Sequence, residues 1–242
     1  FAGLGATSAV LMLVFKDTIS GLAAGVRLTS NDMLHKGDWI TVKSVDANGI
    51  VEDMSLTTVK VRNFDNTIVT ISPTTLVNGS FQNWIGMQKS GGRRVKRVVY
   101  FDFRSVRLVD ETLKRNLLAK HFATEDSFKL KESLQKAIDK DIQEGKDIED
   151  LKNPAALAPT NLQLYRKFME KYLRQRPEVN TDLTLMVRHM EATQCGLPIE
   201  FYFFIKDKVW VNYEHILADI MEHAYALANE FGLKIYEQYP EQ

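Results

Sequence analysis

The chain opens with a run of fifteen residues that contains no charge. Residues 1–15 read FAGLGATSAVLMLVF, and small side chains crowd the first half of this run. A helix without a polar face must be buried on all sides, in a protein core or in a membrane. In lipid, small residues allow neighbouring helices to approach closely. The pattern therefore predicts the inner part of a transmembrane helix that packs against copies of itself.

The length of this run limits the interpretation. A helix of fifteen residues is about 22 Å long, whereas the hydrocarbon core of a bilayer is ~30 Å thick. The run also starts at the first residue, which is Phe1 rather than Met. We therefore expect the chain to be a fragment that begins inside a longer hydrophobic segment. A buried core helix or the remnant of a signal peptide is the alternative that these residues leave open.

A second helix is predicted after the polar pair Lys16-Asp17. Residues 18–34 carry apolar side chains at helical spacing, and Gly21 and Gly25 lie four residues apart on a neighbouring face. A polar side chain at the start of this segment could cap the helix. The pattern favours a helix that bends at the membrane surface. One continuous helix, with the glycines as packing positions, fits the spacing nearly as well.

The periodicity changes from helical to alternating after residue 34. Short alternating segments are separated by turn signals such as Lys36-Gly37-Asp38 and Asp46-Ala47-Asn48-Gly49. This spacing predicts a small β-barrel or curled sheet over residues 35–90. Pro73 should end its last strand, because proline cannot donate a hydrogen bond to a neighbouring strand. The segment Ser90-Gly91-Gly92 is then the clearest linker of the chain.

Residues 91–242 are predicted to form a ferredoxin-like α/β domain, from the element order β-α-(α)-β-β-α-β. A charged stretch at about 121–160 interrupts this order and is interpreted as a helical insertion or a solvated excursion. The predicted strands are 95–103, 183–190, 199–205 and, at the edge, 233–236. The predicted helices are 106–121, 162–173 and 213–231.

Charge and cysteine content exclude some classes of protein. The chain has 31 basic and 31 acidic residues, and a net charge of zero argues against a dedicated nucleic-acid surface. Arg93, Arg94 and Arg97 belong to a basic cluster, but stacking aromatic residues are not interleaved with them. We therefore expect no nucleic-acid partner. Cys195 is the single cysteine, so the chain forms no internal disulfide, which fits a reducing compartment.

Catalytic patterns are weak throughout the sequence. The five histidines are scattered, and no two of them lie at the i, i+4 spacing of a helical zinc site. Nothing in the sequence places a base beside Cys195, which a thiol nucleophile would need. The sequence therefore predicts no catalytic residue, no metal site and no cofactor, and the chain is not expected to be an enzyme.

The order of elements and several motifs resemble the mechanosensitive channel of small conductance (MscS) family. The resemblance is specific from residue 1 to about residue 83 and architectural beyond it. The insertion and the C-terminal part are similar to the miniconductance YbdG-type branch of the family. The motifs are the stretch from Gly5-Ala6 to Leu22-Ala23-Ala24-Gly25-Val26, then Lys36-Gly37-Asp38-Trp39-Ile40, Gly49-Ile50-Val51-Glu52, and Phe64-Asp65-Asn66 followed by Val69-Thr70-Ile71.

This resemblance implies a fold, an assembly and a function. The fold class is an α+β fragment of a membrane protein, with a kinked pore-lining transmembrane helix, a small Sm-like β-domain and a ferredoxin-like C-terminal domain. Seven copies would form a homoheptamer in the bacterial inner membrane, with residues 35–242 as a cytoplasmic chamber. The assembly would contact membrane lipids, open under membrane tension and release ions and small solutes during osmotic stress.

The resemblance also assigns residues to the pore. Gly5, Ala9 and Leu13 would line it, because the two leucines that narrow the pore in the family fall on Ala9 and Leu13. Only Leu13 agrees with the family pattern, so Met12 or Phe15 is an alternative position for the constriction.

Two further groups of residues receive roles from the resemblance. The kink glycine of the family falls on Asp17, and Gly21 and Gly25 are the other expected points of helix flexibility. The basic cluster of Arg93, Arg94 and Arg97 is expected near a side portal of the chamber.

Two other functions stay open at this point. The first is a membrane-anchored oligomeric scaffold, or a regulator of the response to osmotic stress, that conducts little. The second follows from the likeness of the β-domain to Sm-type rings, and is an RNA-binding oligomer. Ring symmetry with a continuous axial pore, and current under membrane tension, distinguish the channel from both.

Overall fold

A computed structural model describes residues 2–129, 136, 139–140, 143 and 158–238 of the chain, and side chains in the first helix from residue 12 onward. Most of the predicted insertion at about 121–160 lies outside the described residues. The chain divides into two compact units, Phe1–Ser90 and Gly91–Gln242, and each is described by itself. The division into three domains that the sequence predicts stays a prediction.

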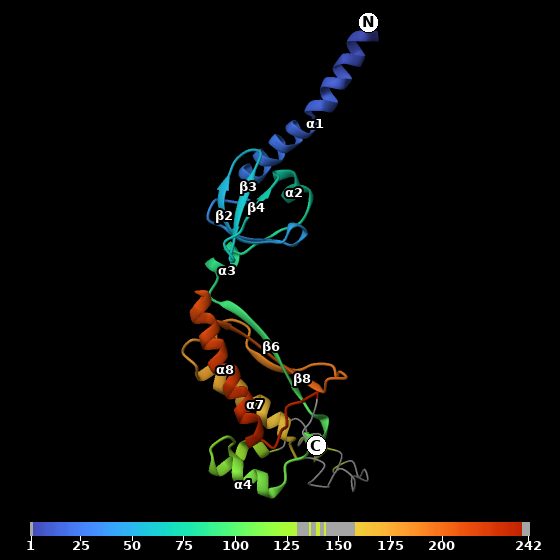
Figure 1. Ribbon diagram of the computed structural model, residues 1–242. Helices are drawn as coiled ribbons and strands as arrows, with labels where there is room; N and C mark the ends of the chain where they lie inside the picture. The colour runs from blue at the N-terminus through green and yellow to red at the C-terminus, as the bar shows by residue number, and fades with distance from the viewer. Residues whose placement is uncertain (1, 130–135, 137–138, 141–142, 144–157, 239–242) are drawn as a thin grey trace. The chain divides into compact units, whose positions relative to one another are not determined.

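The first unit begins with one long helix, α1 (Ala2–Ser30) (Figure 1). The prediction of two helices that meet at Lys16-Asp17 was therefore wrong, and the alternative of a continuous helix is the observed one. Neither residue breaks a helix, because both keep their backbone N–H groups and have helix-compatible side chains. At its end, the N–H of Met33 donates to the carbonyl of Leu28 (3.1 Å), and Asp32 adopts the left-handed conformation (φ 51°) typical of a helix stop.

An antiparallel sheet of five strands follows α1, in the order β4-β3-β2-β1-β5. The turn predicted at residues 46–49 lies three residues earlier in the chain. The chain turns through the 3-10 segment Lys43–Val45 and Asp46, and Ala47 already belongs to a strand. The strands are β1 (Trp39–Val42), β2 (Ala47–Met54), β3 (Val59–Asn63), β4 (Ile68–Ile71) and β5 (Gln82–Asn83).

Two short helices, α2 (Pro73–Asn78) and α3 (Ile85–Lys89), complete this unit. Pro73 follows β4 and occupies the first turn of α2, where a missing N–H costs nothing. It ends β4 as predicted, but β4 is not the last strand, because β5 follows later in the chain. The core of the unit joins Leu28 of α1 and Leu76 of α2 to the inward side chains of the sheet. These inward side chains include Ile40, Val42, Ala47, Val51, Val59, Val61 and Ile71.

The second unit contains a three-stranded antiparallel sheet in the order β6-β8-β7, with helices over one face (Figure 1). The predicted helix 106–121 starts only at residue 111, because the Asp110 carboxylate caps the helix by accepting the Leu113 N–H (2.7 Å). The elements are β6 (Arg93–Phe101), α4 (Glu111–Ala119), α7 (Asn161–Gln175), β7 (Met186–His189), β8 (Leu197–Ile205) and α8 (Trp210–Glu230).

The predicted last strand, 233–236, is reduced to a single antiparallel bridge between Ile235 and Phe101 at the free edge of β6. The ferredoxin-like arrangement of this unit therefore stays a prediction. In the core, the Tyr165 hydroxyl of α7 donates to the Ala224 carbonyl of α8 (2.6 Å).

Two buried polar residues tie this second unit together. The side-chain amide of Asn161 donates to the carbonyls of Ser105 (2.9 Å) and Phe231 (3.1 Å), which are far apart in the sequence. The Glu200 carboxylate on β8 is fully buried, and it pairs with Arg188 of β7 (2.5 Å) and Lys96 of β6 (3.6 Å).

Candidate functional site

From Met12 onward, where its side chains are described, α1 presents large apolar side chains to its surroundings. Leu13, one of the predicted pore-lining residues, is 73% exposed. Contiguous exposed apolar surface is typical of a site that contacts another protein or a membrane. The exposed set on α1 comprises Met12, Leu13, Val14, Phe15, Ile19, Leu22 and Val26.

The other predicted pore-lining residues, Gly5 and Ala9, lie on α1 before its described side chains begin. Their roles, and that of Leu13, stay predictions. Within the described part of the chain, no helix has both the length and the apolar character needed to cross a bilayer.

The C-terminal part of α1 is anchored in the β-domain by a close backbone contact. A Cβ atom at Gly25 would lie 2.1 Å from the carbonyl oxygen of Leu56, in the loop between β2 and β3. Only glycine fits at this position. Gly21, one turn earlier, has no such neighbour within 4 Å, and Asp17 is exposed. The two glycines therefore occupy different environments, and the predicted roles of Asp17, Gly21 and Gly25 in a kink stay predictions.

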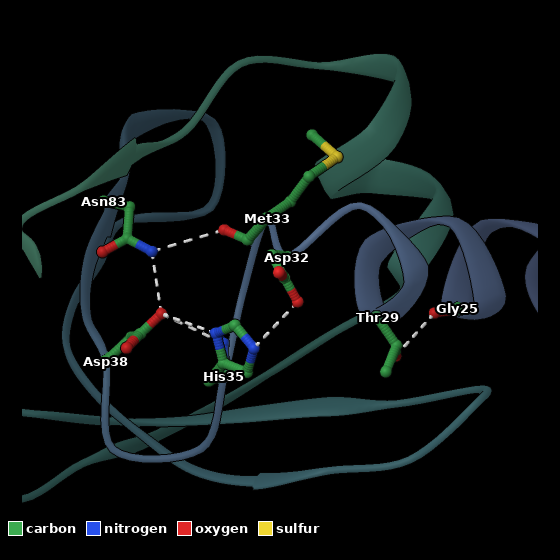
Figure 2. A network of polar contacts seen from close by, with 7 residues as sticks. All are labelled: Gly25, Thr29, Asp32, Met33, His35, Asp38 and Asn83. Atoms are coloured by element: carbon green, nitrogen blue, oxygen red, sulfur yellow. Dashed lines mark hydrogen bonds and ion pairs between the residues drawn. The ribbon is translucent and has the colours of Figure 1, made fainter.

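A polar network holds the segment that connects α1 to the sheet (Figure 2). The Asp38 carboxylate, only 6% exposed, accepts hydrogen bonds from the His35 backbone N–H (3.0 Å) and the Asn83 side-chain amide (2.8 Å). The Asn83 amide also donates to the Met33 carbonyl (3.3 Å). Asn83 belongs to β5, the edge strand beside β1, so this network joins the end of α1 to that edge of the sheet.

The His35 side chain lies between two carboxylates of the same network. Its Nε2 atom is 3.5 Å from Asp32, and its Nδ1 atom is 3.9 Å from Asp38 (Figure 2). A protonated imidazole would be attracted to both. Within the last turn of α1, the Thr29 hydroxyl donates to the Gly25 carbonyl (3.1 Å). Several short-range contacts therefore hold the junction between α1 and the sheet.

An aromatic cluster lies beside this junction on the β-domain. The rings of Trp39 and Trp84 stack with centroids 4.7 Å apart, and Phe64 meets Trp39 edge-on at 5.3 Å. The indole N–H of Trp84 donates to the Thr41 hydroxyl (2.9 Å). These contacts hold the chain after β5 against β1.

The basic cluster predicted from the sequence is divided between the two faces of β6. Arg93 and Arg97 share one face and Arg94 takes the other, because side chains alternate along a strand. The Arg93 guanidinium lies over the ring of Tyr213 (4.3 Å), and the Tyr213 hydroxyl donates to the Arg94 carbonyl (2.9 Å). Burial raises the pKa of Tyr213, so its hydroxyl stays protonated. The portal role of the three arginines stays a prediction.

Features of an enzyme or metal site are few. Among the residues that the structure describes, no group of three or more His, Cys, Asp or Glu side chains could hold a metal ion. Cys195 is a free, exposed thiol in the loop before β8.

A comparison with protein families matches residues 17–86 to the model of the mechanosensitive ion channel β-domain. The matched region covers the end of α1, the junction and the five-stranded sheet.

Curated relatives agree with this family. The small-conductance mechanosensitive channel MscMJ of Methanocaldococcus jannaschii is 34% identical over 82 residues, which are 34% of this chain and 23% of the relative. The large-conductance channel MscMJLR of the same organism is 29% identical over 126 residues, which are 52% of this chain and 34% of the relative. The chain thus spans about a quarter to a third of these relatives. Their names describe channels, in agreement with the prediction that the chain is not an enzyme.

Solved structures share the fold at low sequence identity. The closed state of MscS from Helicobacter pylori matches with a TM-score of 0.60 and 14% identity, over 100% of this chain and 71% of that one. MSL1 from Arabidopsis thaliana matches with a TM-score of 0.61 and 10% identity, over 98% of this chain and 64% of that one. These likenesses concern the fold alone.

Proposed function

We propose, from the premise that the chain belongs to the MscS family of mechanosensitive channels, that it forms the pore-proximal part of a channel opened by membrane tension. One observation carries the proposal: an exposed apolar helix surface continues directly into a helix end that is anchored in the family's β-domain. Such a helix has a free apolar part for a membrane or a neighbouring copy and a fixed part for transmitting force.

The closed gate, in this proposal, is a ring of apolar side chains contributed by α1 from each copy. A narrow apolar ring disfavours water, so it blocks ions without filling the pore. Leu13 would form this ring, with the small side chain of Ala9 one turn earlier. Membrane lipids would surround the helices, and ions and small solutes would pass.

Tension would act on the free part of α1 while the anchored part stays with the β-domain. The Gly25 contact with Leu56 and the Asp38–Asn83 hydrogen bond oppose separation of the helix end from the sheet. Any bend is therefore expected before the anchor, where Gly21 has open space. Tension can favour the open state only if that state differs in its interaction with the membrane, as a state of larger in-plane area does.

Several finer features belong to the same proposal. The assembly is a homoheptamer of the bacterial inner membrane, with residues 35–242 in the cytoplasm. Its C-terminal domain is ferredoxin-like, and Arg93, Arg94 and Arg97 contribute positive charge near a portal. Assignment to the miniconductance YbdG-type branch is part of the proposal as well.

The test uses patch recording under suction with the protein reconstituted in liposomes. Leu13→Ser should open at lower tension because it hydrates the ring at every copy, and Ala9→Leu should raise the threshold. Val14→Ser is the matched control on the same exposed stretch and should change the threshold less. Unaltered thresholds in both test variants would place the gate elsewhere. If the wild-type protein is incorporated but gives no current under tension, the scaffold is the better function.

A further inference from the structure

A groove runs along α7 in the second unit, on the side that faces the chain after α4. Its volume is about 420 Å³, which is within the range of small-molecule sites. One wall consists of α7 positions that recur at helical spacing, and the other of residues that follow α4. The lining residues used below are Lys167, Phe168, Lys171 and Tyr172 on α7, with Phe122 and Ser127 opposite.

The charge of the groove has a single sign. Lys167 and Lys171 lie four residues apart, so they project from the same side of α7. His121 is a third basic group in the lining, and no carboxylate is among the described residues that line the groove. Two like charges at this spacing oppose each other in a helix, and a bound anion would relieve that repulsion. Although the chain has no net charge, these basic side chains form a local positive patch.

The base of the groove is aromatic. The rings of Phe122 and Phe168 meet edge-on with centroids 5.2 Å apart, and both side chains are half-buried. The Tyr172 ring, also half-buried, stacks on the ring of His223 with centroids 5.7 Å apart. The Phe122 and Phe168 rings therefore give the groove an aromatic base.

Hydroxyl groups complete the opposite wall. The Ser127 hydroxyl accepts from the Thr124 backbone N–H (3.1 Å), and the two side-chain oxygens of these residues are 3.2 Å apart. The segment Glu125–Phe128 is thereby held as one 3-10 turn. The wall is preorganised by its own hydrogen bonds, which lowers the cost of ordering it around a ligand.

We propose that this groove binds a small organic anion that joins a planar ring to a phosphate group, with a mononucleotide as the class that fits best. The phosphate lies between Lys167 and Lys171, and the ring lies against the aromatic base. A phosphate can accept charge-assisted hydrogen bonds from both lysine ammonium groups. The aromatic side chains of the groove can stack with any nucleobase.

Titration calorimetry on the full chain tests this site, with AMP, adenosine and inorganic phosphate as separate probes. AMP should bind saturably, and adenosine and phosphate should each bind at least about tenfold more weakly, because each lacks one half of the recognition. The double variant Lys167→Gln with Lys171→Gln should weaken AMP binding at least about tenfold, the loss expected for charge-assisted hydrogen bonds.

Arg174→Gln is the matched control, because Arg174 is an exposed cation on the same helix and does not line the groove. Its AMP affinity should equal that of the wild type. Equal losses in the control and the double variant would show general charge attraction and overturn the proposal. Phosphate binding as tight as AMP, or no saturable AMP binding, would overturn it too. The measurement needs no ion current, so its outcome is separate from that of the channel proposal.

Discussion

Gly25 and Gly21 form a natural pair for testing how α1 is attached to the β-domain. Both are glycines on the same helix, one turn apart, and replacement by alanine adds the same Cβ atom to each. At Gly25 this atom would lie 2.1 Å from the Leu56 carbonyl oxygen, whereas at Gly21 it would meet nothing within 4 Å. The same substitution should therefore have opposite effects on stability.

The size of each effect follows from two terms. Glycine to alanine in a helix interior gains about 0.8–1 kcal/mol from backbone propensity. Gly21→Ala should keep this gain, which raises the melting temperature by about 2–4 °C in a chain of this size. At Gly25 the added Cβ would clash with the Leu56 backbone, which cannot rotate away as a side chain can, so the cost lies in the upper part of the overpacking range, about 2–3 kcal/mol. The net loss there should be about 1–2 kcal/mol, which lowers the melting temperature by roughly 2–8 °C.

Thermal unfolding of the purified full chain in detergent, followed by circular dichroism, measures both variants beside the wild type. A useful second readout is the hydrogen exchange of residues 24–30, which should quicken only in Gly25→Ala. If both variants melt higher by the same amount, the helix does not press against the β2–β3 loop as described. That outcome would also remove the anchor on which the proposed transmission of tension depends.

Two further predictions concern buried polar groups. Asp38→Ala removes the acceptor of the His35 N–H and one of the two acceptors of the Asn83 amide, and should lower the free energy of unfolding by about 1–3 kcal/mol in urea titrations. Asp53→Ala, an exposed control, should change it by less than about 0.5 kcal/mol. Equal effects of the two would contradict the role of the junction. Burial raises the pKa of Tyr165 well above its usual value of 10.0, so the unfolded chain loses this proton first and stability should fall as the pH rises through about 10. Tyr165→Phe should reduce this alkaline loss, and an unchanged pH profile would show that another group causes it.

Regular apolar patterns in the sequence predicted the elements of the second unit well. The helical spacing from Tyr213 to Phe231 corresponds to α8, and Gly232 has the positive φ (68°) expected after a helix end. The prediction of a helix over residues 106–121 was wrong at its start, and the reason is physical. Val106 and Val109 do pack against the core, but they do so from non-helical chain, and the informative signal was the capping residue Asp110.

The junction could not be predicted from local patterns. Asn83 lies 45 residues from Asp38, and no periodicity relates the two. The motif that contains Asp38 indicated that this position matters, but it did not indicate that Asn83 is its hydrogen-bond partner. Gly25 illustrates a similar limit, because the sequence suggests the conformational freedom of glycine, whereas the structure shows a close approach to Leu56. A spacing along one helix carries no information about the distance to a loop that folds back later.

The buried Glu200 carboxylate has a consequence for how the sheet of the second unit assembles. Its two cations come from the strands on either side, so all three strands must be aligned for the charge to be compensated. A slip of one residue would turn Glu200 toward the helices, among side chains such as Phe201 and Phe203. An uncompensated buried charge costs several kcal/mol, about 3–5 kcal/mol when one partner of a buried pair is lost. The ion triad thus favours the correct strand register mainly because it raises the free energy of misaligned sheets. It lowers the free energy of the correctly aligned sheet by less.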